Sequence, residues 1–249
     1  MKRAIITGGS RGIGLAISRR LHREGFEIMS ISRDGFKDEI GPQSLHIRAD
    51  LGTDSGIEIV QRMMLKHGWD APVQVLVNNA GIAKAALLEN TSLADHMEMI
   101  SVNYIGAVAM TKIALPLLKA NKGGSIINIA SISGLTGFST MSAYCASKFA
   151  LVGFGLVAAK ELAKHNIRVN NVCPGPTQTD MWDELDAQYR KINGWETDTE
   201  SEQAYLSKLL IKRMGHPDDV ADAVEYLVSD RASYITGTNF KVCGGNLIG

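Results

Sequence analysis

The sequence predicts a single α/β domain over residues 1–249, built on a doubly wound parallel sheet of about seven strands with helices on both faces. Three observations support this fold class. Short apolar runs typical of buried strands alternate with helical stretches along the chain. A glycine-rich turn separates the first apolar run from the first helical stretch. The 249 residues contain no repeat, linker or low-complexity tract that indicates a second domain.

The expected strands lie at residues 4–7, 27–32, 44–49, 73–78, 125–130, 167–172 and 239–242. Gly25 is expected to end the first helix, Thr53 or Asp54 to cap a later one, and Pro217-Asp218-Asp219 to begin another. Strands that alternate with helices in this way form a parallel sheet. Such sheets bind ligands at the carboxyl ends of their strands.

The glycine-rich turn is Thr7-Gly8-Gly9-Ser10-Arg11-Gly12-Ile13-Gly14. Glycines permit backbone conformations and close approaches that a Cβ atom prevents, and the amides at a helix start can hold a pyrophosphate. The spacing is Gly-x-x-x-Gly-x-Gly rather than the commoner Gly-x-Gly-x-x-Gly, so the usual pattern alone is a weak signal. With a strand before it and a helix after it, the turn predicts a Rossmann-like dinucleotide site.

A tyrosine and a lysine four residues apart, Tyr144 and Lys148, lie on one face if the segment is helical. The ammonium is expected to lower the pKa of the phenol from its usual value of ~10, which suits acid/base work at neutral pH. Ser131, thirteen residues upstream, supplies a hydroxyl for a substrate oxygen. Such pairs also occur on solvated helix faces, so the glycine turn is what favours a catalytic role.

Taken together, these motifs resemble the short-chain dehydrogenase/reductase family nearly end to end. The segment from Arg213 to Gly245 looks like that of 3-oxoacyl-[acyl-carrier-protein] reductases, and many sugar, polyol and ketone dehydrogenases share it. The resemblance implies four catalytic residues: Asn103, Ser131, Tyr144 and Lys148. The cofactor-binding residues that it implies, together with the nucleotide turn, are Thr7, Gly8, Ser10, Arg11, Gly12, Ile13, Gly14, Ser32, Arg33, Asp50, Leu51, Asn79, Ala80, Gly81, Tyr144, Lys148, Pro174, Gly175, Thr177 and Thr179.

In the implied proton path, Tyr144 is the acid or base, Lys148 also holds the nicotinamide ribose, and Ser131 positions the substrate oxygen. Asn103 helps to hold a water that connects Lys148 to solvent. Without the other three residues, Asn103 would be read as a polar interruption in a long apolar helix.

The end of the second strand bears on the choice of dinucleotide, because an arginine there pairs with a 2′-phosphate and an acidic residue repels it. The sequence at this point is Ser32-Arg33, and Arg11 is a second cation. Both favour NADP(H) over NAD(H). Asp34 takes the acidic role if the strand ends one residue later.

A long polar segment at about residues 177–213 is expected, from the resemblance, to fold over the substrate as a lid. Residues 181, 185, 189 and 192 share one face of a possible helix that packs on the body. From residue 180 to 202 the segment has eight acidic residues against two basic ones, which disfavours a polyanionic substrate or an acidic carrier protein. The apolar and aromatic residues in question are Met181, Trp182, Leu185, Tyr189, Ile192 and Trp195.

Composition narrows the partners. The 26 acidic and 26 basic residues give no general attraction to nucleic acid or to an anionic membrane, so a small molecule is the expected ligand. Three cysteines do not indicate a disulfide framework, no Cys/His pair has a metal spacing, and we expect no secretory signal at the start. We expect a cytoplasmic protein without a metal. The resemblance implies a homotetramer or a homodimer.

The sequence therefore predicts an NADPH-dependent oxidoreductase that interconverts a carbonyl and a secondary alcohol. A 3-oxoacyl thioester, a ketone and a sugar or polyol all remain open as substrates. The alternative is an NADP(H)-binding redox-sensing regulatory protein without turnover. The presence of Asn103, Ser131, Tyr144 and Lys148 together favours the enzyme, because a sensor has no need of all four.

Overall fold

A computed structural model describes residues 2–35 and 39–247 of the chain. Its centre is a parallel sheet in the order β3-β2-β1-β4-β5-β6-β7. The order reverses between β1 and β4, so the predicted doubly wound sheet of seven strands is confirmed. The strands are β1 (Lys2–Thr7), β2 (Phe26–Ser32), β3 (Leu45–Arg48), β4 (Val75–Asn78), β5 (Gly124–Ile129), β6 (Ile167–Pro174) and β7 (Asn239–Val242).

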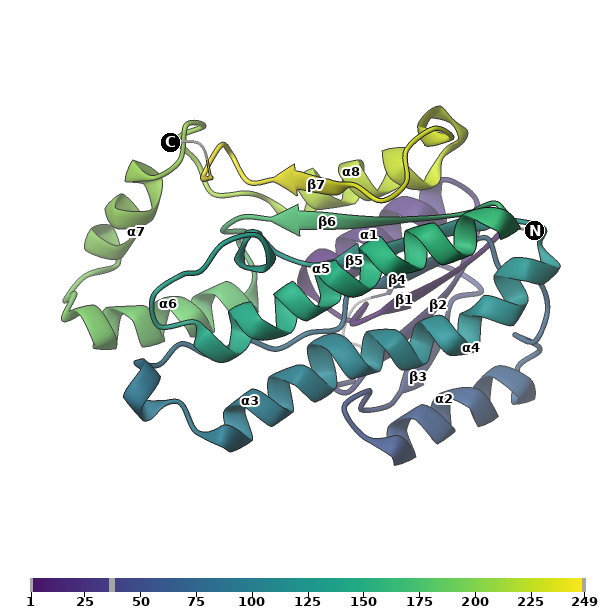
Figure 1. Ribbon diagram of the computed structural model, residues 1–249, viewed down its shortest axis with the longest axis horizontal. Coiled ribbons are helices and arrows are strands. Elements are labelled where there is room, and N and C mark those ends of the chain that lie inside the picture. The colour runs from purple at the N-terminus through teal and green to yellow at the C-terminus, as the bar shows by residue number, and fades with distance from the viewer. Residues whose placement is uncertain (1, 36–38, 248–249) are drawn as a thin grey trace.

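Helices cover both faces of the sheet. Helices α2, α4 and α5 lie on one face, and α1 and α8 lie together on the other (Figure 1). Helices α6 and α7 extend beyond the carboxyl ends of the strands (Figure 1). The helices are α1 (Gly12–Arg23), α2 (Asp54–Lys66), α3 (Leu93–Ile100), α4 (Gly106–Ala120), α5 (Ser142–Leu162), α6 (Asp180–Asn193), α7 (Asp198–Ser207) and α8 (Pro217–Val228).

The core has two main layers because consecutive strand residues point to opposite faces. In β1, Ile5 packs in the layer under α2, α4 and α5, whereas Ala4 and Ile6 pack in the layer under α1 and α8. All three side chains are fully buried. A central parallel strand covered on both faces therefore has an almost continuous apolar sequence, as this one does.

The helix boundaries follow local signals in the sequence. Gly25, just beyond α1, has a φ of 82°, a conformation that glycine adopts without strain. Of the two expected caps of α2, Thr53 is the one used: its side chain accepts a hydrogen bond from the Gly56 amide. Pro217 begins α8 as expected, behind a capping box formed by His216 and Asp219.

Four asparagines form a row of side-chain hydrogen bonds across β4, β5, β6 and β7, which we call the amide ladder; the first three are buried and Asn239 is half-buried. Asn78 donates to Asn128 at 2.9 Å, Asn128 to Asn171 at 3.0 Å, and Asn171 to Asn239 at 2.8 Å. Helix α5 lies directly on this row, because a Cβ atom on Gly155 would be 2.1 Å from the Asn171 side-chain oxygen. The ladder thereby sets the distance between α5 and the sheet.

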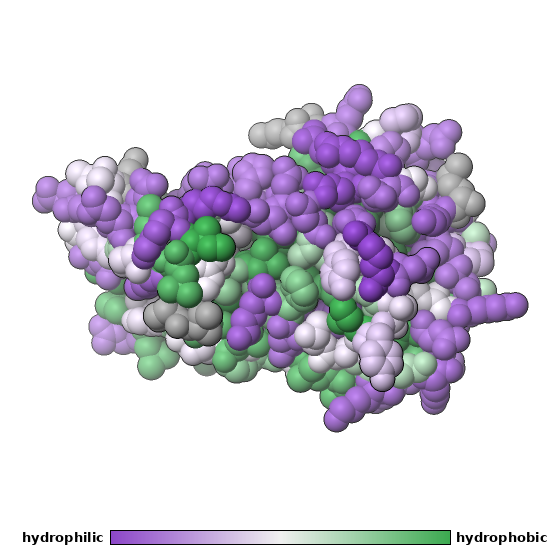
Figure 2. All heavy atoms as spheres, turned by 90° about the horizontal axis from the view of Figure 1, so that it is seen from above, coloured by the Kyte–Doolittle hydropathy of each residue, from purple (hydrophilic) through white to green (hydrophobic). Residues whose placement is uncertain are grey.

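Two stretches, Leu93–Ala120 and Ser142–His165, are long and apolar enough to cross a membrane by length and composition alone. Core helices meet the same criteria, and the second stretch includes α5, which packs against β6. Apolar side chains also reach the surface of these helices, such as Leu93 and Phe149. On the face seen in Figure 2, hydrophilic residues predominate and hydrophobic residues reach the surface in patches.

Candidate active site

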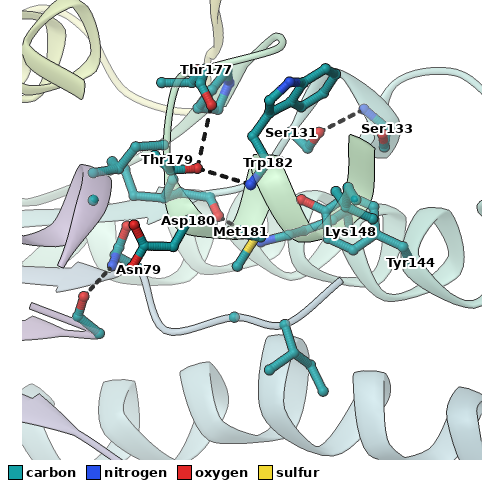
Figure 3. A pocket seen from close by; sticks show the side chains of 18 of the residues that line it. Asn79, Ser131, Ser133, Tyr144, Lys148, Thr177, Thr179, Asp180, Met181 and Trp182 are labelled. Atoms are coloured by element: carbon teal, nitrogen blue, oxygen red, sulfur yellow. Dashed lines mark hydrogen bonds between the residues drawn. The ribbon is translucent and has the colours of Figure 1, made fainter. Parts of the chain in front are cut away.

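A cavity with a volume of about 460 Å³ lies at the carboxyl edge of the sheet. It runs from the glycine turn to the start of α5, and residues of α6 and α7 line its outer side. Figure 3 places Asn79 at one end and Ser131, Tyr144 and Lys148 at the other. The structure thus brings to one cavity nearly all the residues singled out in the sequence. Of the predicted catalytic and cofactor-binding residues, all but Thr7 and Asn103 line it.

The glycine turn needs its glycines. Gly8 and Gly12 have φ values of 68° and 52°, in the left-handed region. A Cβ atom on Gly14 would lie 2.1 Å from the Gly8 carbonyl oxygen, closer than any real contact. The turn therefore folds tightly onto the start of α1, whose first amides have no partner within the helix and face the ligand side of such a turn.

Thr7 acts from beneath the turn. Its hydroxyl accepts hydrogen bonds from the amides of Asn79 and Ala80, each at 2.9 Å. The Asn79 side chain in turn donates to the carbonyls of Thr7 and Gly8. Thr7 is 2% exposed, so its side chain joins the segment after β4 to the glycine turn rather than lining the cavity.

The segment after β6 closes the other side of the turn. Thr177 pairs with Gly215 as an isolated bridge, and the Thr179 hydroxyl caps α6 by accepting from the Trp182 amide. The methyl group of Thr179 lies 3.2 Å from the position that a Cβ on Gly12 would take. Pro174 and Gly175 with these threonines therefore line the cavity next to the glycine turn.

The end of β2 carries two opposite charges. Ser32 is buried and accepts a hydrogen bond from the Ser10 amide at 3.3 Å, while Arg33 and Asp34 are both exposed and both line the cavity. Their side chains lie 3.5 Å apart. Arg11 reaches the cavity as well, with Asp180 of α6 at 3.4 Å. After β3, Asp50 and Leu51 line the same end.

At the far end, three side chains converge from β5 and α5. The Ser131 hydroxyl accepts a hydrogen bond from the Ser133 amide at 3.0 Å and is hydrogen-bonded to Tyr144. Lys148 lies one helical turn after Tyr144, with its Nζ 5.6 Å from the centre of the tyrosine ring. That nitrogen donates to the Ile129 carbonyl at 2.9 Å. Tyr144 and Lys148 share one face of α5 because they are four residues apart, and Ser131 joins them because it follows the end of β5.

The prediction that Lys148 lowers the pKa of Tyr144 is wrong for the protein without a bound cofactor. Burial raises the pKa of Tyr144 to about 12, although the hydrogen bond with Ser131 acts in the opposite direction. Burial also lowers the pKa of Lys148 to about 8. The reason is that both groups are withdrawn from water, which disfavours phenolate and ammonium alike, and the ammonium donates to Ile129 instead of the phenol.

Asn103 lies in a π-helical turn, Ser101–Ile105, between α3 and α4, and is fully buried. Its side chain accepts from the Ile82 amide at 2.8 Å and donates to the Ile82 carbonyl and to Ser147, each at 2.9 Å. The polar interruption in the apolar helix therefore coincides with a change from α-helical to π-helical backbone. These bonds tie the segment after Gly81 to α5 next to Lys148.

The segment predicted to form a lid contains α6 and α7, which line the cavity, and the expected packing face of α6 is confirmed. Leu185 is buried, and Met181, Tyr189 and Ile192 pack with it against a small cluster that includes Tyr144. Gln188 accepts a hydrogen bond from the Ala85 amide at 2.7 Å, which fixes α6 to the segment after β4.

Some cavity residues were not recognised in the sequence. Phe138 and Met141 lie in the sequence between Ser131 and Tyr144, and this position alone indicates that they are near the site. Tyr205 of α7 and Asn246 have no motif around them, and only the folding of distant segments brings them to the cavity.

The sheet order and the cavity at the carboxyl edge of the sheet are those of the nucleotide-binding α/β class. The family model for short chain dehydrogenases matches residues 2–190. The chain belongs to this family.

Relatives in the family act on varied substrates. The chain is 32% identical to the 3-oxoacyl-[acyl-carrier-protein] reductase of Thermotoga maritima, over 99% of this chain and 98% of that one. It resembles the structure of L-sorbose reductase from Gluconobacter frateurii in complex with NADPH and L-sorbose (TM-score 0.89, 29% identity, 100% and 97% coverage). It also resembles 4-hydroxyisoleucine dehydrogenase in complex with NADH (TM-score 0.85, 27% identity, 100% coverage of both chains).

Proposed function

We propose that this protein is an NADPH-dependent oxidoreductase that interconverts a carbonyl and a secondary alcohol, with Tyr144 as the general acid and base. The observation that carries the proposal is the convergence of Ser131, Tyr144 and Lys148 at one end of a cavity whose other end is the glycine turn. A nicotinamide dinucleotide held on that turn would have room in the cavity to reach the three side chains.

The residues around the cavity fit such a dinucleotide. The glycine turn offers helix-start amides for the pyrophosphate, and Arg33 and Arg11 are cations at the adenine side. Lys148 has two donors left for ribose hydroxyls, because only one of its three goes to Ile129. When bound, the nicotinamide supplies hydride to the carbonyl carbon or accepts it from the alcohol carbon.

The proton moves through the chain's own side chains. Tyr144 is neutral at pH 7, so its hydroxyl can donate a proton to the substrate oxygen during reduction and take one back during oxidation. Ser131 accepts from the Ser133 amide and is hydrogen-bonded to Tyr144, so its hydroxyl lies where it can donate to a substrate oxygen placed beside the phenol. With a pKa of about 8, Lys148 is mostly protonated at pH 7 and stabilises the phenolate that forms. Asn103 positions the segment beside Lys148.

The preference for NADPH rests on Arg33. Its guanidinium is exposed at the cavity and can form charge-assisted hydrogen bonds with a 2′-phosphate, whereas Asp34 beside it would repel that group. We expect the arginine to dominate because Arg11 adds a second cation nearby. The substitution Arg33→Asp should weaken NADPH use roughly ten- to hundredfold with little loss for NADH.

Arg62→Asp is the matched control for this substitution, since Arg62 is exposed on α2 and does not line the cavity. Steady-state kcat/KM for both cofactors measures the effect. Equal discrimination in Arg33→Asp and in the unmodified protein would remove the basis for the NADPH assignment.

The enzyme itself is tested by cofactor oxidation with a panel of ketones, 3-oxoacyl thioesters and ketoses. We expect turnover that Tyr144→Phe abolishes while cofactor binding, measured by fluorescence titration, is retained. Binding without turnover of any substrate would favour the redox-sensing alternative.

We further propose a homotetramer or homodimer in the cytoplasm. Exposed apolar side chains on α3 and α5, among them Leu93, Met97, Phe149 and Val157, support association, because such surfaces are commonly interfaces. Sedimentation analysis that finds only monomers at micromolar concentration would contradict this assembly.

A further inference from the structure

The part of the cavity beyond Tyr144 is unusually aromatic for this chain. Two of its three tryptophans and three of its six tyrosines line the one cavity. Four of these rings, Trp182, Tyr189, Trp195 and Tyr205, come from the lid, and we call them the aromatic wall. Figure 3 shows Trp182 on the same side of the cavity as Ser131 and Tyr144.

The wall is organised around Tyr205 of α7. Trp182 packs against it edge to face with ring centres 4.7 Å apart, Tyr189 at 5.9 Å and Trp195 at 6.0 Å. The interplanar angles, 74°, 62° and 89°, are those of T-shaped pairs. Three rings that meet a fourth in this way form one continuous aromatic surface.

The surface is held in place before any substrate arrives. The Gln188 side chain accepts from the Ala85 amide at 2.7 Å, and Ser201 of α7 donates to Asp186 of α6 at 2.7 Å. Tyr189 also packs in the cluster that contains Tyr144, so the wall continues up to the proposed proton donor. A rigid wall costs little to order on binding and favours a ligand of matching shape.

Polar side chains also line the cavity, among them Thr140, Asn193, Lys208 and Asn246, and none of them belongs to the wall itself. Asn193 is exposed and its amide donates to the Tyr189 carbonyl, while Thr140 donates to the neighbouring Ser139 carbonyl. The carboxylate of Asp180 lies with Arg11 near the glycine turn. A sugar or polyol is recognised by several convergent donors and acceptors, one set for each hydroxyl, and the wall offers rings instead.

We propose that the substrate is an aryl ketone, or the corresponding secondary alcohol, whose ring lies against the aromatic wall while its oxygen meets Tyr144 and Ser131. The inference rests on the proposed function and narrows its substrate class. An aryl ring gains roughly two- to tenfold in affinity from edge-to-face contacts, beyond the area that it buries, and a saturated ring of the same size does not.

The first experiment compares acetophenone, cyclohexyl methyl ketone and a ketohexose as substrates of the unmodified protein. We expect kcat/KM to be highest for acetophenone, at least about threefold above its saturated analogue. The substitution Trp182→Leu should remove this preference, and Trp182→Phe should largely restore it. Tyr234→Leu is the control, because Tyr234 is fully exposed and does not line the cavity.

A second measurement does not depend on turnover. Binding of 1-phenylethanol to Tyr144→Phe, loaded with the oxidised cofactor, should quench tryptophan fluorescence, because Trp182 and Trp195 line the cavity whereas Trp69 is buried at the other end of the sheet beside Arg3. The quenching should be weaker for 1-cyclohexylethanol and absent for xylitol. Circular dichroism confirms that each variant retains its helices.

The two hypotheses fail differently. Turnover of the ketohexose or the saturated ketone at an efficiency equal to or above that of acetophenone would overturn the aryl assignment and leave the oxidoreductase intact. Specific binding of 1-phenylethanol without turnover of any ketone would support the aryl site and count against the enzyme. Equal quenching by all three alcohols, or none by any, would also overturn the aryl assignment.

Discussion

Replacement of Lys148 by methionine is expected to stabilise the protein at neutral pH while it removes activity. Lys148 is 4% exposed, and burial lowers its pKa from 10.5 to about 8. A lysine whose pKa is lower in the folded state than in the unfolded state destabilises the fold. The loss of stability is complete at pH values below the folded pKa, where the lysine is charged in both states. The loss becomes smaller as the pH rises from about 8 toward 10.5, because Lys148 is then neutral in the folded state and still charged in the unfolded state.

The magnitude follows from the shift in pKa. The fall in the pKa of Lys148 from 10.5 to about 8 corresponds to about 3 kcal/mol of lost stability at pH 7, and linkage removes roughly half of that loss at pH 9.5. Methionine has a similar length and no charge, but it also removes the hydrogen bond to the Ile129 carbonyl, which is worth about 1 kcal/mol. Lys148→Met should therefore gain about 2 kcal/mol at pH 7 and almost nothing at pH 9.5.

Urea denaturation of the protein without added cofactor, followed by circular dichroism at pH 7 and pH 9.5, measures this change. The pKa of Tyr144 is raised from 10.0 to about 12 on folding, so its effect on stability develops between these two values, above both pH values used. Lys160→Met is the matched control, because Lys160 is exposed on the same helix. A stability difference that is the same at both pH values, or a variant that is less stable at pH 7, would refute the reasoning.

Two further substitutions test the geometry of the fold. Gly14→Ala should lower the melting temperature and abolish cofactor binding, because its Cβ would lie 2.1 Å from the Gly8 carbonyl oxygen. Gly137→Ala is the control and should do neither, because a Cβ there meets open space. Normal cofactor affinity in Gly14→Ala would contradict the close approach. Asn128→Ala should destabilise the protein by about 2 kcal/mol in urea denaturation, since it leaves partners in the buried amide ladder unpaired. The exposed Asn90→Ala is the comparison, and equal effects of the two would argue against the ladder.

Local pattern was enough to predict the framework. Each of the seven expected apolar runs overlaps an observed strand, and the run at 239–242 coincides with β7. The four-residue interval predicts that Tyr144 and Lys148 share one helix face, and α5 confirms it. The predicted apolar face of α6 is confirmed in the same way. These features follow from the periods of helix and strand, which are properties of the chain over a few residues.

Other features needed partners from distant parts of the chain. Thr7 is predicted to bind the cofactor, and the structure shows that its hydroxyl accepts hydrogen bonds from Asn79 and Ala80, more than seventy residues later. The wall around Tyr205 exists only because α6 and α7 fold against each other at the end of the sheet.

The sequence by itself determined the parallel sheet, the glycine turn at its edge and the side chains available for proton transfer. Only the tertiary structure decided how those side chains titrate and what surrounds them. A neighbour four residues away gives a Coulomb contribution that can be anticipated, whereas desolvation depends on everything that packs around a group. For Tyr144, burial is the largest influence and raises the pKa of the phenol, and the effect that opposes it comes from the hydrogen bond with Ser131 rather than from Lys148.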